Sequence, residues 1–174
     1  RWMAGRRESF LSDTQGRDHR TRATLALDGE GHFLALRVDT RADVGAYVST
    51  FGAAIPGPIY SALLAGVYRT PAIYVEVTGA YSNTVPTDAY RGAGRPEACY
   101  VLERLADKAA RKLGIDRAEI RRRNLIPREA MPYKTPIGPT YDCGDFPKVL
   151  RRALEAGDYA GFPERKRKSK KLRG

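Results

Sequence analysis

One loop of the sequence carries residue types that could bind a ligand. Residues 89–97 read AYRGAGRPE and stand immediately before a segment with helical periodicity. The glycines let backbone N–H groups approach a ligand closely, and a helix start adds unpaired donors with a partial positive charge. Arg91 and Arg95 add full charges suited to phosphate. A plain glycine-rich connection into a helix explains the same residues, and the loop matches neither a P-loop nor a dinucleotide fingerprint.

Other residues with reactive or metal-binding side chains are few and scattered. Cys99 and Cys143 lie far apart and form no CxxC pair, which favours neither a disulfide framework nor a zinc or iron–sulfur site. His19 and His32 are also isolated from one another in the sequence. We therefore expect reduced thiols, solvated histidines and no metal ligands among the side chains of this chain.

Alternating apolar residues predict three strands in the first half of the chain. Residues 20–28 and 32–39 each alternate with period two, and the tetrapeptide DGEG at 28–31 joins them as a hairpin. A third alternating stretch covers residues 72–80. Between the second and third strands, an apolar segment predicts a short buried helix at about residues 59–67.

The second half of the chain is predicted to be helical. Pro96 suits the first position of a helix, and an apolar stripe follows it. Gly114 reads as the end of that helix. Asp116 to Glu119 has the pattern of a capping box, which begins a second helix that ends near Pro127.

A third helix is expected after a loop rich in proline and glycine. Asp145 is its cap and Gly157 ends it. An antiparallel hairpin and a further strand followed by helices is the order of an α+β fold. The 174 residues suffice for one core and show no internal repeat, so we expect one domain.

The net charge of +11 is concentrated at one end of the chain. Residues 164–174 hold seven Lys/Arg and one Glu, which accounts for six of the eleven excess positive charges. Such a run is typical of a solvated helix end, and it has no interleaved aromatic side chains for base stacking. No apolar run approaches the roughly 20 residues that a membrane helix needs, and no segment has the pattern of a signal peptide. We expect a cytoplasmic protein without membrane contact.

Several separated segments resemble one enzyme family. AYRGAGRPEA is similar to the active-site loop of the molybdenum hydroxylases, the family of xanthine dehydrogenase, aldehyde oxidase and the large subunit of aerobic carbon monoxide dehydrogenase. RWMAGRRESFLSDTQGRDH resembles a strand-and-loop segment of that family. The likeness continues in GAYVSTFGAAIPG, in YRTPAIYVEVTGAYSNTVPTD and in LGIDRAEIRRRNLIP. Nearly the whole chain is covered, in the order and spacing of the bacterial large subunits.

The resemblance implies an internal part of the molybdopterin-binding subunit, with residues 1–163 as a partial domain and 164–174 as a basic tail. Arg91 would lie in the loop that contacts the molybdenum–molybdopterin cofactor, in most bacterial members a cytosine dinucleotide form. Tyr90, Gly92 and Ala93 would line the same pocket. The remainder of the large subunit would complete the site. [2Fe–2S] clusters and FAD would lie on partner subunits, an iron–sulfur small subunit and an FAD-binding medium subunit.

Departures from the family pattern narrow the substrate. Carbon monoxide dehydrogenases carry a copper-binding cysteine where this chain has Gly92, so carbon monoxide oxidation is disfavoured. Xanthine- and aldehyde-oxidising members often have a phenylalanine where this chain has Ala93, which cannot stack on a ring. The substrate-binding arginine of animal xanthine dehydrogenases falls near Ile59, which argues against xanthine. The expected substrate is therefore an aldehyde, an N-heterocycle or a similar small molecule.

No catalytic residue is assigned to this chain. The general-base glutamate, the glutamine near the metal and the upstream glycine-rich loop of the family have no counterpart in it. Glu97 stands beside the loop, but a carboxylate in the first turn of a helix is explained by the helix dipole. Two alternatives stay open: a non-catalytic truncated family member, and a nucleic-acid-binding module that uses the basic tail.

Overall fold

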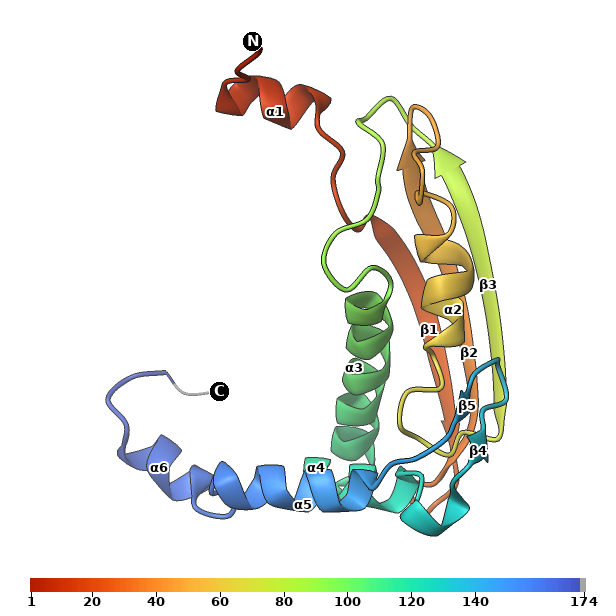
Figure 1. Ribbon diagram of the computed structural model, residues 1–174. Helices are drawn as coiled ribbons and strands as arrows, with labels where there is room; N and C mark the ends of the chain where they lie inside the picture. Colours follow the sequence, from red (N-terminus) through yellow and green to blue (C-terminus); the bar gives the residue numbers. More distant parts are fainter. Residues whose placement is uncertain (173–174) are drawn as a thin grey trace.

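The computed structural model describes residues 1–172, which fold around one three-stranded sheet (Figure 1). The sheet has the order β1-β2-β3, with β1 at His19–Leu27, β2 at Phe33–Gly45 and β3 at Ala72–Tyr81. β1 pairs with β2 in antiparallel fashion, and β3 runs parallel to β2. The described chain is therefore a mixture of helices and strands of the predicted α+β kind.

Helices and two short strands complete the architecture. The helices are α1 Arg6–Ser12, η1 Ile55–Ile59, α2 Tyr60–Ala62, α3 Arg95–Leu113, α4 Arg117–Asn124, η2 Arg128–Ala130, α5 Phe146–Ala156 and α6 Phe162–Lys168, and the short strands are β4 Tyr133–Lys134 and β5 Thr140–Tyr141. Figure 1 shows α2 and α3 on the same face of the sheet, with α1 projecting at one end of it and α5 and α6 at the other.

The core lies between α3 and that face of the sheet. Leu36 and Val38 of β2 meet Leu102 and Ala106 of α3 in one buried cluster, which also contains Tyr60. Alanines on α3 let the helix approach the sheet closely. Burying each of the larger side chains stabilises the fold by about 1.5–3 kcal/mol.

The predicted hairpin and third strand are confirmed, but β2 is longer than expected. It continues past Asp39 to Gly45, and Thr40, Ala42 and Val44 carry on the buried alternation. The predicted end at residue 39 is wrong because threonine and alanine are weak apolar signals. Their burial depends on α2 and the loop that cover this half of the strand.

Two other expectations fail in the first half of the chain. The helix predicted at 59–67 lies earlier, in η1 and α2, and residues 63–67 form turns. Gly66 has φ +56°, which interrupts a right-handed helix. The N-terminal segment, expected as strand and loop, instead contains α1.

The helix boundaries predicted from capping residues are confirmed. Gly114 ends α3 with φ +67°. Asp116 accepts hydrogen bonds from the backbone of residues 118 and 119, and Asp145 accepts one from the N–H of Lys148. Glu119 does not complete a capping box, because its carboxylate pairs with Arg122 and Arg123 instead.

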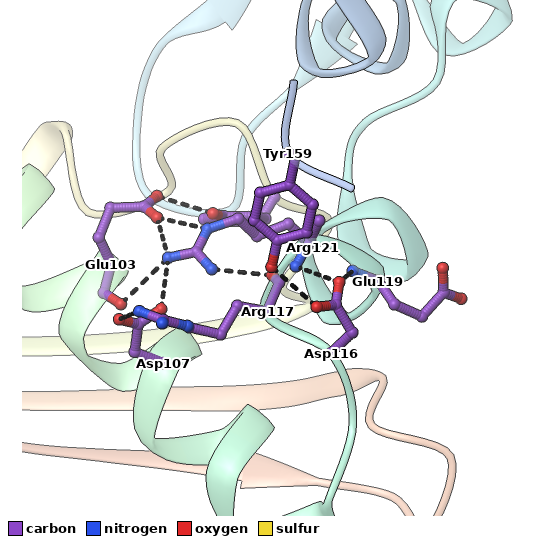
Figure 2. Close-up of polar contacts among 9 residues, drawn as sticks. Glu103, Asp107, Asp116, Arg117, Glu119, Arg121 and Tyr159 are labelled. Atoms are coloured by element: carbon purple, nitrogen blue, oxygen red, sulfur yellow. Dashed lines mark hydrogen bonds and ion pairs between the residues drawn. The ribbon is translucent and has the colours of Figure 1, made fainter. Parts of the chain in front are cut away.

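A polar network joins α3 to α4 (Figure 2). The Arg121 guanidinium lies 2.6 Å from the carboxylate of Glu103 and 3.0 Å from that of Asp107. At the other side of the network, the Tyr159 hydroxyl donates to Asp116. This network holds α4 against the surface of α3.

The buried amide of Asn124 ties the end of α4 to the hairpin. It donates to the carbonyl oxygens of Gly31 and Ile120, and its own oxygen accepts from the N–H of Phe33. These bonds satisfy backbone groups that would otherwise be buried without partners. The sequence contained no local signal for this link, because its ends are 93 residues apart.

The basic tail is partly helical. α6 runs from Phe162 to Lys168 and so crosses the boundary expected at 164. Glu164 pairs with Arg167 and Lys168, and Arg165 pairs with Asp158. Among residues 1–172, no helix is long and apolar enough to cross a membrane.

Candidate functional site

The predicted loop connects β3 to α3, and Gly94 seats its end against the core. Gly94 is the N-cap of α3 at φ +83°. A Cβ there would lie 3.0 Å from the backbone nitrogen of Tyr60 and 3.1 Å from the side chain of Ile59. Glycine is therefore required both by its left-handed backbone and by the close approach of α2.

Two consecutive turns give the loop its shape. The N–H of Ala93 donates to the carbonyl of Tyr90 at 2.8 Å, and the N–H of Arg95 donates to that of Gly92 at 3.1 Å. Gly92 has φ +87° and Ala93 has φ +27°. A non-glycine residue at positive φ is strained, and such strain persists where the surroundings hold it. The loop is a defined structure rather than a slack connection.

Asp88 anchors the beginning of the loop. Its carboxylate accepts hydrogen bonds from the Ser49 hydroxyl, from the N–H of Phe51 at 3.2 Å and from the N–H of Ala89 at 2.6 Å. The bond from Ser49 and those from the two backbone groups hold the pKa of Asp88 below its ordinary value, against a smaller opposing effect of burial. The carboxylate is therefore ionised wherever the protein is folded near neutral pH.

A segment before β1 runs beside the loop. The N–H of Gln15 donates to the carbonyl of Pro86, and the carbonyl of Gln15 accepts from the N–H of Asp88. A Cβ on Gly16 would lie 2.6 Å from the Cβ of Tyr90. The side chain of Arg17 reaches the loop and lies 5.2 Å over the ring of Tyr90.

The four residues predicted to bind cofactor lie together on this loop, and three of them are exposed. Tyr90 is 67% exposed, Arg91 and Gly92 are exposed, and Ala93 is half-buried. Within residues 1–172, the Arg91 guanidinium has neither a hydrogen-bond partner nor an ion-pair partner. A Cβ on Gly92 would lie 3.0 Å from the ring of Pro96. The loop thus offers a free cation and an uncovered backbone.

This donor set fits an anionic or polar heterocyclic group such as a molybdopterin. The side chain at Arg91 can donate to phosphate or carbonyl oxygens, and glycine at 92 leaves the adjacent peptide open to close approach. In the described part of the chain, no group of three or more His, Cys, Asp and Glu side chains is arranged to hold a metal ion. The thiols of Cys99 and Cys143 are free and exposed.

A groove of about 680 Å³ lies beside the loop, between β1 and α3. His19, Thr21, Glu97, Tyr100 and Arg104 are among its lining residues, whereas the four predicted cofactor-binding residues are not. Burial lowers the pKa of His19, against the opposing effects of Glu97 and Asp18. The expectation of a solvated histidine is wrong for His19, because its ring packs edge-on against Tyr60.

Sequence reasoning missed Gly16, Arg17 and Asp88 as supports of the loop. Arg17 donates to the carbonyl oxygen of Arg91, 74 residues away, and no local sequence pattern predicts a contact over that separation. Asp88 follows Thr87 in an unremarkable loop sequence, and its partner Ser49 is 39 residues away. The signals available were the turn-forming composition of the segment QGRD at 15–18 and the family resemblance of the segments that contain these residues, and neither shows which side chains meet.

Comparison with known proteins gives a family match over most of the chain. The family described as the molybdopterin cofactor-binding domain matches residues 1–125. The carbon monoxide dehydrogenase large chain of Hydrogenophaga pseudoflava is 36% identical over 93% of this chain and 20% of its own length. Subunit gamma of the 6-hydroxypseudooxynicotine dehydrogenase complex of Paenarthrobacter nicotinovorans is 33% identical over 99% of this chain and 22% of its own length.

A solved structure shows the same fold. Quinoline 2-oxidoreductase from Pseudomonas putida 86 superposes with a TM-score of 0.88 and 34% identity, covering 95% of this chain and 21% of that one. The chain therefore spans about a fifth of the length of the relatives it matches.

Proposed function

The chain belongs to the molybdopterin cofactor-binding domain family, and on that premise we propose that its loop at residues 90–93 contacts the molybdenum cofactor of a hydroxylase large subunit. The main observation in support of this proposal is the exposed Arg91 guanidinium, which is unpaired within residues 1–172. It stands beside Gly92 on a loop held in place at both ends. A side chain with full charge and no internal partner is suited to an external ligand.

We propose a role for each of the four residues, supported by its position on the loop. Arg91 would donate to oxygens of the cofactor, and Gly92 would let the cofactor approach the backbone. Tyr90 and Ala93 would form the adjoining wall. When bound, the cofactor supplies oxidative hydroxylation, in which the substrate loses two electrons and gains an oxygen derived from water.

The substrate is proposed to be an aldehyde, an N-heterocycle or a similar small molecule. Gly92 supplies no thiolate that could hold copper, which argues against carbon monoxide. Two of the compared proteins are named for quinoline and for 6-hydroxypseudooxynicotine, and one for carbon monoxide. Ala93 leaves room where a stacking ring would otherwise stand.

Finer features of the assembly belong to the same proposal. We propose the cytosine dinucleotide form of the cofactor, [2Fe–2S] and FAD on small and medium partner subunits, and a cytoplasmic location. Names such as large chain and complex subunit gamma among the relatives support a multi-subunit assembly. We propose that the domain extends beyond the matched residues 1–125 to residue 163, because Phe146 and Leu150 of α5 pack against the core. Residues 164–174 then form the basic tail.

Replacing Arg91 in the full-length subunit tests the proposal. Arg91→Ala should lower the molybdenum and pterin content per subunit by about tenfold. A change of this size is expected because the variant loses one charge-assisted contact with the cofactor, worth about 1.4 kcal/mol. The thermal midpoint of the cofactor-free subunit should stay unchanged, because the guanidinium has no partner in the described chain.

Arg22→Ala is the matched control, since Arg22 is an exposed arginine on the outer face of β1. Cofactor content and stability that fall together in Arg91→Ala would mean a structural role only. A full-length protein without molybdenum and pterin, from a host with ample molybdenum, would favour the non-catalytic alternative.

A further inference from the structure

We propose that Arg17 is a positioning residue for the cofactor loop, acting through a charge pair with the largely buried carboxylate of Glu97 and a hydrogen bond to the backbone of Arg91. The proposal deepens the function proposed for residues 90–93 and rests on it. The Arg17 guanidinium donates to the carbonyl oxygen of Arg91. Its Nε lies 3.3 Å from the carboxylate of Glu97, in the first turn of α3.

Arg17 thus joins three parts of the site with one side chain. Besides the loop carbonyl and the start of α3, it covers the ring of Tyr90, with the guanidinium carbon 5.2 Å from the ring centre. Guanidinium groups combine planar donors with a face that stacks on aromatic rings, whereas an ammonium group does not. An arginine is therefore the residue type that meets all three contacts.

Glu97 depends on Arg17 for its charge compensation. Its side chain is only 9% exposed, and neither carboxylate oxygen has a hydrogen-bond partner in the described chain. His19 lies nearby, but burial favours its neutral form and its Nδ1 is also without a partner among residues 1–172. A buried carboxylate without its cation is strongly disfavoured.

The backbone before β1 is strained in a way that delivers Arg17 to the loop. Arg17 has φ +60°, a left-handed conformation that costs a non-glycine residue roughly 1–2 kcal/mol. Gly16 packs so closely on Tyr90 that a Cβ would lie 2.6 Å from the Tyr90 Cβ. A segment that only connected α1 to β1 would need neither feature.

Holding the Arg91 carbonyl sets the direction of the next N–H. The peptide between Arg91 and Gly92 is planar and trans, so its N–H points opposite to its C=O. With the carbonyl turned toward Arg17, the N–H of Gly92 is turned away from Arg17. Arg17 thereby orients the backbone donor of the loop while the Arg91 side chain stays free.

The test uses the full-length large subunit, with four variants: Arg17→Met, Glu97→Gln, the double variant, and Arg22→Met as the matched control. Hydrogen exchange of residues 88–94 is measured in the cofactor-free subunit, together with its thermal midpoint. Molybdenum and pterin per subunit are measured separately. The first two readouts do not depend on activity or on cofactor.

Arg17→Met should raise exchange in the loop by about tenfold or more, lower the thermal midpoint and lower cofactor content several-fold. Adding Glu97→Gln should restore the midpoint, because it removes the uncompensated buried charge. It should restore neither the slow exchange nor the cofactor content, because the bond to the Arg91 carbonyl is still missing. Arg22→Met should match the unchanged protein in all three.

Two results would overturn the proposal. Loop exchange that is unchanged in Arg17→Met would show that Arg17 does not hold the loop. Recovery of slow exchange and cofactor content in the double variant would show that Arg17 only neutralises Glu97. Failure of the proposed function looks different: Arg91→Ala would then leave cofactor content unchanged while Arg17→Met still raised loop exchange.

Discussion

At the scale of single residues, the site depends on backbone conformations that most side chains avoid. Gly92, Ala93 and Gly94 all have positive φ, and they stand consecutively between Arg91 and α3. Each turns the chain in a direction that a right-handed helix cannot take. Together they present Arg91 outward while Gly94 returns the chain to the core.

Gly94→Ala should destabilise the start of α3 by about 2–4 kcal/mol, from positive φ and from contact with α2 together. The measurement is native-state hydrogen exchange of the first turn of α3 in the full-length subunit. Gly114→Ala is the matched control, because Gly114 has φ +67° but nothing within 4 Å of the added Cβ. It should cost only about 1–2 kcal/mol at the other end of α3. Equal losses of stability in the two variants would mean that the close contact with Tyr60 and Ile59 contributes nothing to the effect of Gly94→Ala.

At the scale of elements, α3 is the part that relates the loop to the rest of the chain. Glu97 lies in its first turn, and its middle packs against the sheet. On its surface, Glu103 and Asp107 bind Arg121 of α4. Burial and the hydrogen bond to Glu103 raise the pKa of Tyr68, whose hydroxyl donates to that carboxylate. The side-chain oxygens of Glu103 are therefore shared between the phenol of Tyr68 and the guanidinium of Arg121.

Arg121→Met should weaken the attachment of α4 by about 1–3 kcal/mol, between the values typical of exposed and buried ion pairs. The Arg121 side chain is 18% exposed, so solvent screens its pairs only in part. Hydrogen exchange of α4 in the full-length subunit measures the change. Arg122→Met on the same helix is the control. The Arg122 side chain, which pairs with Glu119, is more than half exposed, so this pair should contribute less than about 1 kcal/mol. Similar losses in both variants would contradict the role of the Arg121 network.

At the scale of the whole molecule, the described fold exposes more surface than its mass predicts. The accessible surface is 11,920 Å², whereas a compact monomer of this mass exposes about 8,500 Å². Large apolar side chains at both ends of the sheet contribute, among them Trp2, Phe10, Tyr81 and Val149. Exposed apolar side chains of this size are typical of a part that packs against more protein.

The 174-residue chain produced alone should therefore bind a hydrophobic dye such as ANS and self-associate. The full-length subunit, where further protein covers these side chains, should bind little dye. Fluorescence titration and sedimentation velocity measure the two effects. A monomeric segment that binds no dye and unfolds cooperatively would show that the segment is a self-sufficient domain.

Much of the fold and part of the site followed from short stretches of sequence. The caps at Asp116 and Asp145, the stop at Gly114 and the hairpin at residues 28–31 were predictable because each depends on neighbours within a turn or two. The loop residues 90–93 were singled out in the same way, by glycines and arginines next to a helix start. Their contact with cofactor stays a prediction.

The supports of that loop were decided only by the tertiary structure. Arg17 meets Arg91 and Glu97, and Asp88 meets Ser49, across separations at which no periodicity operates. The burial that extends β2 to Gly45 and the close contact of Gly94 with Ile59 and Tyr60 are likewise products of packing. The sequence by itself determined the local elements and the chemical character of the loop. Which charges pair, which backbone groups are held and which donors remain free depends on long-range contacts that form only when the sheet and α3 come together.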